Sequence, residues 1–230
     1  MKGQKMKKTI FTMLAVLMVS GVVLSGCKSK EPEPEPEVEP EVEPEVKPVV
    51  KPVVEPEAGK TAPAFTLNSF DGKAISLSDY KGKIVVLEWL NPECPYLRYH
   101  YEKENTMIEL AAKYKARNVI WLAVNSTKHL TPETDKEFAD KHNLAYAILS
   151  DSSGVVGLAY GAKTTPHIFI IDTKGNIAYD GGIDNAPLGN PPEGEELINY
   201  VDKALTELIG GKTVSTTNTK PYGCSVKYAN

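Results

Sequence analysis

Basic residues do not outnumber acidic ones in this sequence. It contains 26 lysines and arginines against 30 aspartates and glutamates, for a formal charge of −4. Because a nucleic-acid-binding protein needs a basic face, nucleic acid is not expected as a partner. A glycine-rich phosphate loop, a paired-carboxylate motif and a haem-attachment signal are also missing, and His129, His142 and His167 do not show metal-ligand spacing. We therefore expect neither a cofactor nor a bound metal.

Cysteine is scarce as well, and its three positions differ in setting. Cys27 ends an apolar stretch, Cys94 stands between a strand-like and a helix-like run, and Cys224 lies six residues from the C-terminus. We interpret the first as a site of lipid attachment, the second as a reactive thiol and the third as a partner of the second.

Residues 1–26 have the pattern of a lipoprotein signal peptide. Lysines precede an apolar run from Ile10 to Leu24, which is shorter than the ~20 residues that a membrane-spanning helix needs. The run ends in Leu-Ser-Gly-Cys27, which resembles the lipobox of bacterial lipoproteins. We expect acylation of Cys27 and a lipid-anchored, extracytoplasmic location on the periplasmic side of a membrane or at the cell surface. An ordinary signal peptide followed by a chance cysteine is the alternative.

Residues 27–58 comprise the lipidated cysteine and a spacer rich in glutamate, proline and valine. Residues 31–57 hold eight prolines, ten glutamates and two lysines. Proline fixes φ and removes backbone donors, so this composition favours extended polyproline II, which at about 3.1 Å per residue reaches roughly 80 Å. We interpret the spacer as a stalk, and a tail without function is the alternative.

Residues 59–211 alternate strand-like and helix-like segments, and residues 212–230 form a tail that carries Cys224. The order predicts an α/β fold with a central mixed β-sheet, helices on both faces, an N-terminal β-hairpin and an antiparallel edge after Pro166. Strands are expected at 64–67, 74–77, 84–90, 119–124, 146–149, 167–171 and 177–179, and helices at 96–117, 131–142, 153–160 and 193–209.

Cys94 lies where the strand ending at Leu90 gives way to a helix. Pro95 suits the first helical position, which makes Cys94 the predicted N-cap. The unpaired amides and the positive end of the helix dipole favour a thiolate there, lower its pKa and create a nucleophile. A buried structural cysteine is the alternative.

The segment from Asp71 to Leu87, with Asp-Gly-Lys, Ser-Leu-Ser-Asp-Tyr-Lys-Gly-Lys and Ile-Val-Val-Leu, resembles the opening of redoxin domains. Trp89 and the run Thr164-Thr165-Pro166 fit the same group. It contains the AhpC/TSA peroxiredoxins and the extracytoplasmic thiol-disulfide oxidoreductases. The resemblance covers about residues 60–210 and implies a thioredoxin-like fold, an antioxidant or oxidoreductase activity and a cis Pro166 beside the active cysteine.

Two departures from this group limit what is carried over. Leu97 occupies the place where thioredoxins have a second cysteine, so the local dithiol is missing. Asn91 stands where typical peroxiredoxins have threonine or serine, although an amide can donate to a peroxide oxygen. Arg98 is the candidate for the arginine that peroxiredoxins hold near the thiolate, and an exposed helix residue is the alternative.

Cys224 offers the missing partner thiol if the tail folds back onto Cys94, because closing a long loop costs little more than closing a short one. We expect Cys94 to attack a peroxide or a protein disulfide, Cys224 to resolve the product, Pro166 to shape the groove, and a thiol reductant partner to restore the pair. Alternatively, the domain is a non-catalytic binding module with a structural Cys94–Cys224 disulfide. His167, next to Pro166, is either a proton-transfer residue or a plain strand-end histidine.

Overall fold

The computed structural model describes residues 59–229. The predicted signal peptide, the lipidation site at Cys27 and the spacer lie outside the described residues, so these interpretations stay predictions. Within the described part of the chain, the helices are too short or too polar to cross a membrane.

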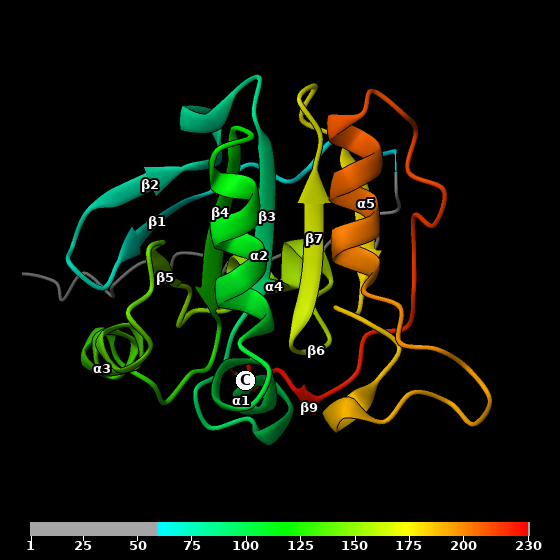
Figure 1. The fold of residues 1–230 in the computed structure, drawn as a ribbon. Helices are drawn as coiled ribbons and strands as arrows, with labels where there is room; N and C mark the ends of the chain where they lie inside the picture. Colours follow the sequence, from blue (N-terminus) through cyan, green and yellow to red (C-terminus); the bar gives the residue numbers. More distant parts are fainter. Residues whose placement is uncertain (1–58, 230) are drawn as a thin grey trace, which may run out of the picture. The chain divides into compact units, whose positions relative to one another are not determined.

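Seven strands form the central sheet of the described domain: β1 (Thr66–Ser69), β2 (Ala74–Ser76), β3 (Ile84–Trp89), β4 (Val119–Asn125), β5 (Ile148–Ser150), β7 (His167–Ile171) and β8 (Ile177–Gly181). Their order is β2-β1-β5-β4-β3-β7-β8 (Figure 1). β4 runs parallel to β3 and β5, whereas β7 is antiparallel to β3 and β8. The expected mixed sheet, its antiparallel edge and the N-terminal hairpin β1–β2 are confirmed.

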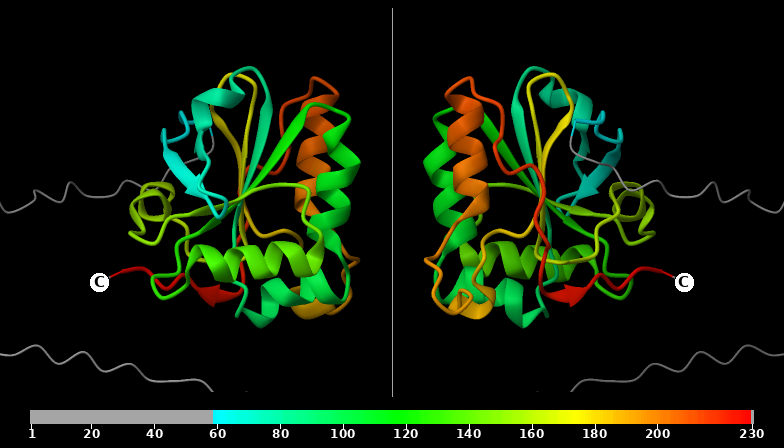
Figure 2. Two further views of the ribbon diagram at one scale, coloured as in Figure 1. Left: turned by 90° about the vertical axis from the view of Figure 1, so that its left-hand side faces the viewer. Right: turned by 90° about the vertical axis from the view of Figure 1, so that its right-hand side faces the viewer.

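Five α-helices accompany this sheet in residues 59–229: α1 (Pro95–Glu102), α2 (Thr106–Lys115), α3 (Pro132–His142), α4 (Val155–Tyr160) and α5 (Tyr200–Ile209). Two short 3₁₀ helices also occur, η1 (Leu77–Tyr80) and η2 (Pro187–Gly189). α2 and α5 lie on one face of the sheet and α4 lies on the other, so the prediction of helices on both faces is confirmed (Figures 1 and 2).

Two predicted helices have the wrong limits. The single helix expected at 96–117 is divided into α1 and α2, because Asn105 adopts a left-handed conformation with φ of +52° that an α-helix does not tolerate. The helix expected from residue 193 begins at Tyr200, where the side chain of Asn199 caps it by accepting from the Asp202 amide at 2.8 Å. Gly194, with φ of +80°, lies in the preceding loop.

Side chains alternate along β3 between two apolar layers, as the period of two in a strand requires. Ile84 and Val86 belong to the layer under α2 and α5, whereas Val85 and Leu87 belong to the layer under α4 and the β1–β2 hairpin. Full burial of such a side chain contributes about 1.5–3 kcal/mol. The two layers therefore fix β3 in the sheet. The carboxyl end of β3 leads into the loop that carries Cys94.

The last part of the chain, residues 212–229, is called the C-terminal arm from here on. It leaves α5, pairs with β8 around Asp180 and then crosses the end of the sheet beside α1 (Figure 1). There its strand β9 (Cys224–Ser225) forms a separate two-stranded ladder with β6 (Thr164–Thr165). The fold thus carries Cys224 back to the end of β3.

Candidate active site

Cys94 is held at the start of α1 by a short loop that leaves β3. The side-chain oxygen of Asn91 accepts from the Glu93 amide at 2.9 Å, and its carbonyl accepts from the Cys94 amide at 3.0 Å. Cys94 is the N-cap of α1, with Pro95 at the first helical position. The predicted capping position is confirmed, and Asn91 shapes the loop that creates it.

The loop before β7 forms the opposite side of the site. The peptide bond between Thr165 and Pro166 is cis, as the resemblance implied. The thiol of Cys94 donates to the carbonyl oxygen of Thr165 at 2.8 Å. Pro166 therefore directly follows the residue that contacts the sulfur.

The C-terminal arm brings the second cysteine to the first. β9 pairs with β6 in antiparallel register, so Cys224 lies opposite Thr165. Both cysteines are free thiols, and the two side chains are hydrogen-bonded to each other although they lie 130 positions apart in the sequence. The missing local dithiol is thus replaced by a pair that the fold assembles.

The two thiols have opposite acidities. Burial raises the pKa of Cys94, but hydrogen bonds from the Thr165 side chain, the Leu97 amide and Cys224 outweigh it and lower the pKa below the ordinary value. The Leu97 amide acts here without the geometry of a full capping hydrogen bond. Burial and the neighbouring Cys94 raise the pKa of Cys224 to about 11. Cys94 is therefore the more acidic thiol of the pair, and Cys224 the less acidic one.

Cys94 is also deeply buried, with 1% of its surface exposed, whereas Cys224 is half-buried. The sulfur of Cys94 lies in the apolar layer that includes Leu90 and Leu97. Burial agrees with the structural alternative, and the lowered pKa agrees with a nucleophile. For an external molecule to reach Cys94, the arm has to move.

Arg98 is not brought to the thiol. Its guanidinium is half-exposed on α1 and donates to both carboxylate oxygens of Glu102, at 3.2 and 3.0 Å. Lys141 donates to the same carboxylate at 2.6 Å. This placement matches the alternative of an exposed helix residue, whereas Cys94, Cys224 and Pro166 come together.

His167 is fully engaged in holding the sheet. Its Nδ1 accepts from the Lys163 amide at 3.1 Å, so its Nε2 carries the proton and donates to Asp180 at 2.6 Å. With both ring nitrogens occupied, the side chain matches the alternative of a plain strand-end histidine.

Three residues near the site were not singled out from the sequence. Thr165 gave no local signal beyond its place before Pro166. Tyr222 lies in a tail whose patterning was its only signal. Glu88 is a charged residue inside the otherwise apolar β3, which is a visible signal: it is fully buried and accepts from Tyr101 Oη at 2.7 Å and Trp121 Nε1 at 2.9 Å.

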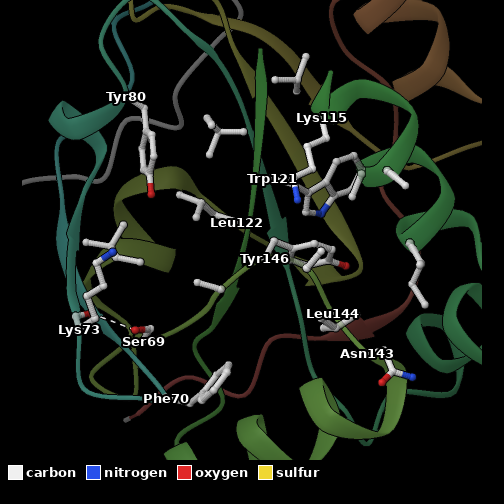
Figure 3. A pocket seen from close by; sticks show the side chains of 18 of the residues that line it. Ser69, Phe70, Lys73, Tyr80, Lys115, Trp121, Leu122, Asn143, Leu144 and Tyr146 are labelled. Atoms are coloured by element: carbon white, nitrogen blue, oxygen red, sulfur yellow. Dashed lines mark hydrogen bonds between the residues drawn. The ribbon is translucent and has the colours of Figure 1, made fainter. Parts of the chain in front are cut away.

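One cavity in the described domain lies away from the cysteines. Its volume is about 720 Å³, and it opens between the β1–β2 hairpin and β4, with Ser69, Lys73 and Tyr80 on one side and Trp121 and Leu122 on the other (Figure 3). Neither Cys94 nor Cys224 lines it. Within residues 59–229, the acidic, histidine and cysteine side chains do not gather into a group of three that could hold a metal.

Comparison with known proteins identifies the family. The model of the AhpC/TSA family matches residues 58–180, more than half of the chain. The chain belongs to the AhpC/TSA family. Within it, the chain is 33% identical over 131 residues to the thiol-disulfide oxidoreductase ResA of Bacillus thuringiensis subsp. konkukian, covering 53% of this chain and 67% of that protein. It is also 33% identical over 122 residues to the thioredoxin-like protein YneN of Bacillus subtilis, covering 53% and 69%.

Solved structures share the fold of this chain. A conserved protein from Geobacillus kaustophilus aligns with a TM-score of 0.67 and 27% identity over 75% of this chain and 92% of its own. A protein from Sinorhizobium meliloti aligns with a TM-score of 0.66 and 24% identity over 75% and 94%. The thioredoxin-like fold is confirmed, and so is the enzyme class, thiol-disulfide oxidoreductase.

Proposed function

We propose that this AhpC/TSA protein exchanges thiols and disulfides with a protein substrate, with Cys94 as nucleophile and Cys224 as resolving thiol. The observation that carries the proposal is the hydrogen-bonded pair itself. Its two thiols have opposite pKa shifts and lie beside the cis Pro166. This is the asymmetry that a two-step exchange needs, because one thiol has to attack and the other has to wait with its proton.

The reaction has two steps. The thiolate of Cys94 attacks one sulfur of the substrate disulfide, which forms a mixed disulfide and releases the other substrate sulfur as a thiolate that takes up a proton. Cys224 then loses its proton and attacks the Cys94 sulfur, so the second substrate thiolate leaves. The substrate gains two electrons and two protons, and the enzyme is left with a Cys94–Cys224 disulfide. An external dithiol partner reduces this bond again.

A disulfide substrate is favoured over a peroxide by what surrounds the sulfur. Peroxide reduction needs donors that polarise the peroxide oxygens. The Arg98 guanidinium, the candidate for such a donor, is paired with Glu102 on α1. Relatives such as the ResA proteins of Bacillus thuringiensis and Geobacillus thermodenitrificans are named thiol-disulfide oxidoreductases.

Substrate access requires the arm to open. The β9–β6 ladder consists of only two residue pairs, Thr164 with Ser225 and Thr165 with Cys224. Such a short ladder adds little stability of its own. We expect the substrate disulfide to reach Cys94 while β9 is detached, and Cys224 to return with it.

The activity is proposed to take place outside the cytoplasm, on a domain tethered through Cys27 and the glutamate- and proline-rich spacer. The support is the lipobox-like sequence and the positive, apolar leader before it. Labelling of cells with a radioactive fatty acid is expected to mark the wild-type chain but not Cys27→Ala. Equal labelling of the two would reject the anchor.

The exchange reaction is tested with insulin as substrate and dithiothreitol as reductant. The wild-type chain is expected to accelerate insulin reduction, Cys94→Ser to be inactive, and Cys224→Ser to accumulate a mixed disulfide. Ser225→Ala, in the same strand β9, is the matched control and should retain the wild-type rate. Consumption of hydrogen peroxide with the same reductant, without insulin reduction, would replace the disulfide substrate by a peroxide.

The non-catalytic alternative is separated by the reduction potential of the Cys94–Cys224 disulfide. A potential above about −250 mV supports turnover, whereas one below about −300 mV is typical of a structural bond. A structural bond combined with no activity in either assay would reject the proposed roles of Cys94 and Cys224.

A further inference from the structure

Tyr222, two residues before Cys224, inserts its phenol between two elements of the domain. Its hydroxyl donates to Oδ1 of Asp184 at 2.6 Å and lies 2.8 Å from Nε2 of His100. Its ring centroid lies 6.1 Å from that of Tyr96. His100 and Tyr96 both belong to α1, the helix that the nucleophile caps. The arm is therefore attached to the same helix that holds its target sulfur.

The hydrogen bonds of this group run in one direction. A carboxylate only accepts, so Tyr222 donates to Asp184 and accepts from the Nε2 proton of His100. Nδ1 of His100 then carries no proton and accepts a hydrogen bond from the Thr106 hydroxyl at 3.2 Å. This assignment uses neutral His100, which is 1% exposed and whose pKa is lowered by burial. Without the phenol oxygen, a buried imidazole N–H and a carboxylate oxygen each lose a partner.

Close packing holds the chain between Tyr222 and Cys224. Gly223 has φ of +133°, and a Cβ at this position would run into the carbonyl oxygen of Thr165. After it, Cys224 is held by the two-pair β9–β6 ladder, and the chain beyond is anchored by the Val226 amide, which donates to the Lys163 carbonyl at 3.1 Å, and by the Tyr228 hydroxyl, which donates to the Ala162 carbonyl at 2.7 Å. Because that ladder is short, the anchors on its two sides decide how much of the time Cys224 lies against Cys94, and Tyr222 is the anchor on the N-terminal side.

We propose that Tyr222 is a positioning residue that sets the effective concentration of Cys224 at Cys94. The proposal rests on the redox function proposed for the pair. When the pair forms its disulfide with oxidised glutathione, the two thiols give up two electrons and two protons, and oxidised glutathione becomes two molecules of reduced glutathione. Formation of a disulfide between two cysteines 130 positions apart depends on how often the Cys224 thiol already lies beside Cys94. The disulfide equilibrium therefore reports the position of the arm.

The test is the equilibrium between the full-length chain and glutathione buffers, with the disulfide fraction measured by mass spectrometry after acid quenching and alkylation. Tyr222→Phe keeps the ring and removes the hydroxyl, and is expected to lower the equilibrium constant about tenfold. Asp184→Asn keeps an oxygen acceptor without the charge and is expected to lower it by a smaller factor. Tyr114→Phe is the control, because its hydroxyl also donates to an aspartate, Asp202, at 2.7 Å, but between α2 and α5.

A second readout separates positioning from a general loss of stability. In the Cys224→Ser background, Tyr222→Phe is expected to raise the alkylation rate of Cys94 several-fold, because the arm is detached more of the time. Tyr114→Phe should leave both the alkylation rate and the glutathione equilibrium within twofold of the parent. Circular dichroism establishes that each variant is folded.

The outcomes distinguish this proposal from the one on which it rests. A glutathione equilibrium within twofold of wild type in Tyr222→Phe would overturn the positioning role and leave the chemistry of the pair untouched. Equal losses in Tyr222→Phe and Tyr114→Phe would overturn it too. A wild-type chain that forms no Cys94–Cys224 disulfide would overturn the proposed function as well.

Discussion

Replacing Glu88 by glutamine changes how the stability of this protein depends on pH. Burial raises the pKa of Glu88 from 4.5 to about 7, against the two hydrogen bonds from Trp121 and Tyr101 that lower it. Between about pH 4.5 and 7, the folded protein keeps a proton that the unfolded chain has released. A rise in pH through this window therefore favours the unfolded chain. The full effect on the free energy of unfolding is about 3 kcal/mol.

Glutamine mimics the protonated acid at every pH, since it offers an oxygen to Trp121 and an N–H to Tyr101. Urea unfolding followed by far-ultraviolet circular dichroism at pH 5, 6, 7 and 8 gives the free energy for both chains. The difference between Glu88→Gln and wild type is expected to shift by about 2–3 kcal/mol in favour of the variant over this range. The subtraction cancels other groups, such as Asp135, whose pKa burial raises to about 6. Parallel curves would refute the reasoning.

Three further predictions concern the site. In the reduced chain, the pH midpoint of the alkylation rate of Cys94 is expected to lie at least two pH units below that of Cys224, whose pKa is raised to about 11. Mass mapping of the labelled thiols checks this order, and the reverse order contradicts it. Gly223→Ala should lower the Cys94–Cys224 disulfide constant in glutathione buffers about tenfold, because the new Cβ displaces β9, whereas Gly210→Ala should not. His167→Ala is expected to cost about 2 kcal/mol in urea unfolding, because two buried hydrogen bonds are lost, yet to leave the insulin-reduction rate within twofold; loss of activity without loss of stability would assign it a chemical role.

The sequence predicted most of the fold, because its signals there are local. The alternation of strands and helices, the turn at Asp71-Gly72 and the helix start at Pro95 depend on short-range preferences of the backbone. The errors arose where a local pattern continued across a break. Apolar residues recur at helical spacing on both sides of Asn105, so the pattern concealed the left-handed residue that separates α1 from α2. The predicted start of α5 was also too early, because the helix begins only after Asn199, whose side chain caps it.

The candidate site was only half predictable. Cys94 and Pro166 were identified from their positions relative to a helix start and a strand start, which short motifs describe. Arg98 lies close to Cys94 in the sequence, but Glu102, one turn further along the same helix, binds its guanidinium. Spacing along a helix cannot show which of several neighbours a long side chain chooses. The partners of Glu88 could not be foreseen either, because they come from other elements of the fold.

By itself, the sequence determined the α/β architecture, the cysteine at the N-cap of α1 and the presence of a second cysteine near the C-terminus. Only the tertiary structure decided that the arm returns across the end of the sheet, buries Cys94 and sets Cys224 against it. The physical reason is the different range of the interactions involved. Backbone preferences act over a few residues and are written in adjacent positions, whereas the meeting of two thiols 130 positions apart depends on the packing of everything between them.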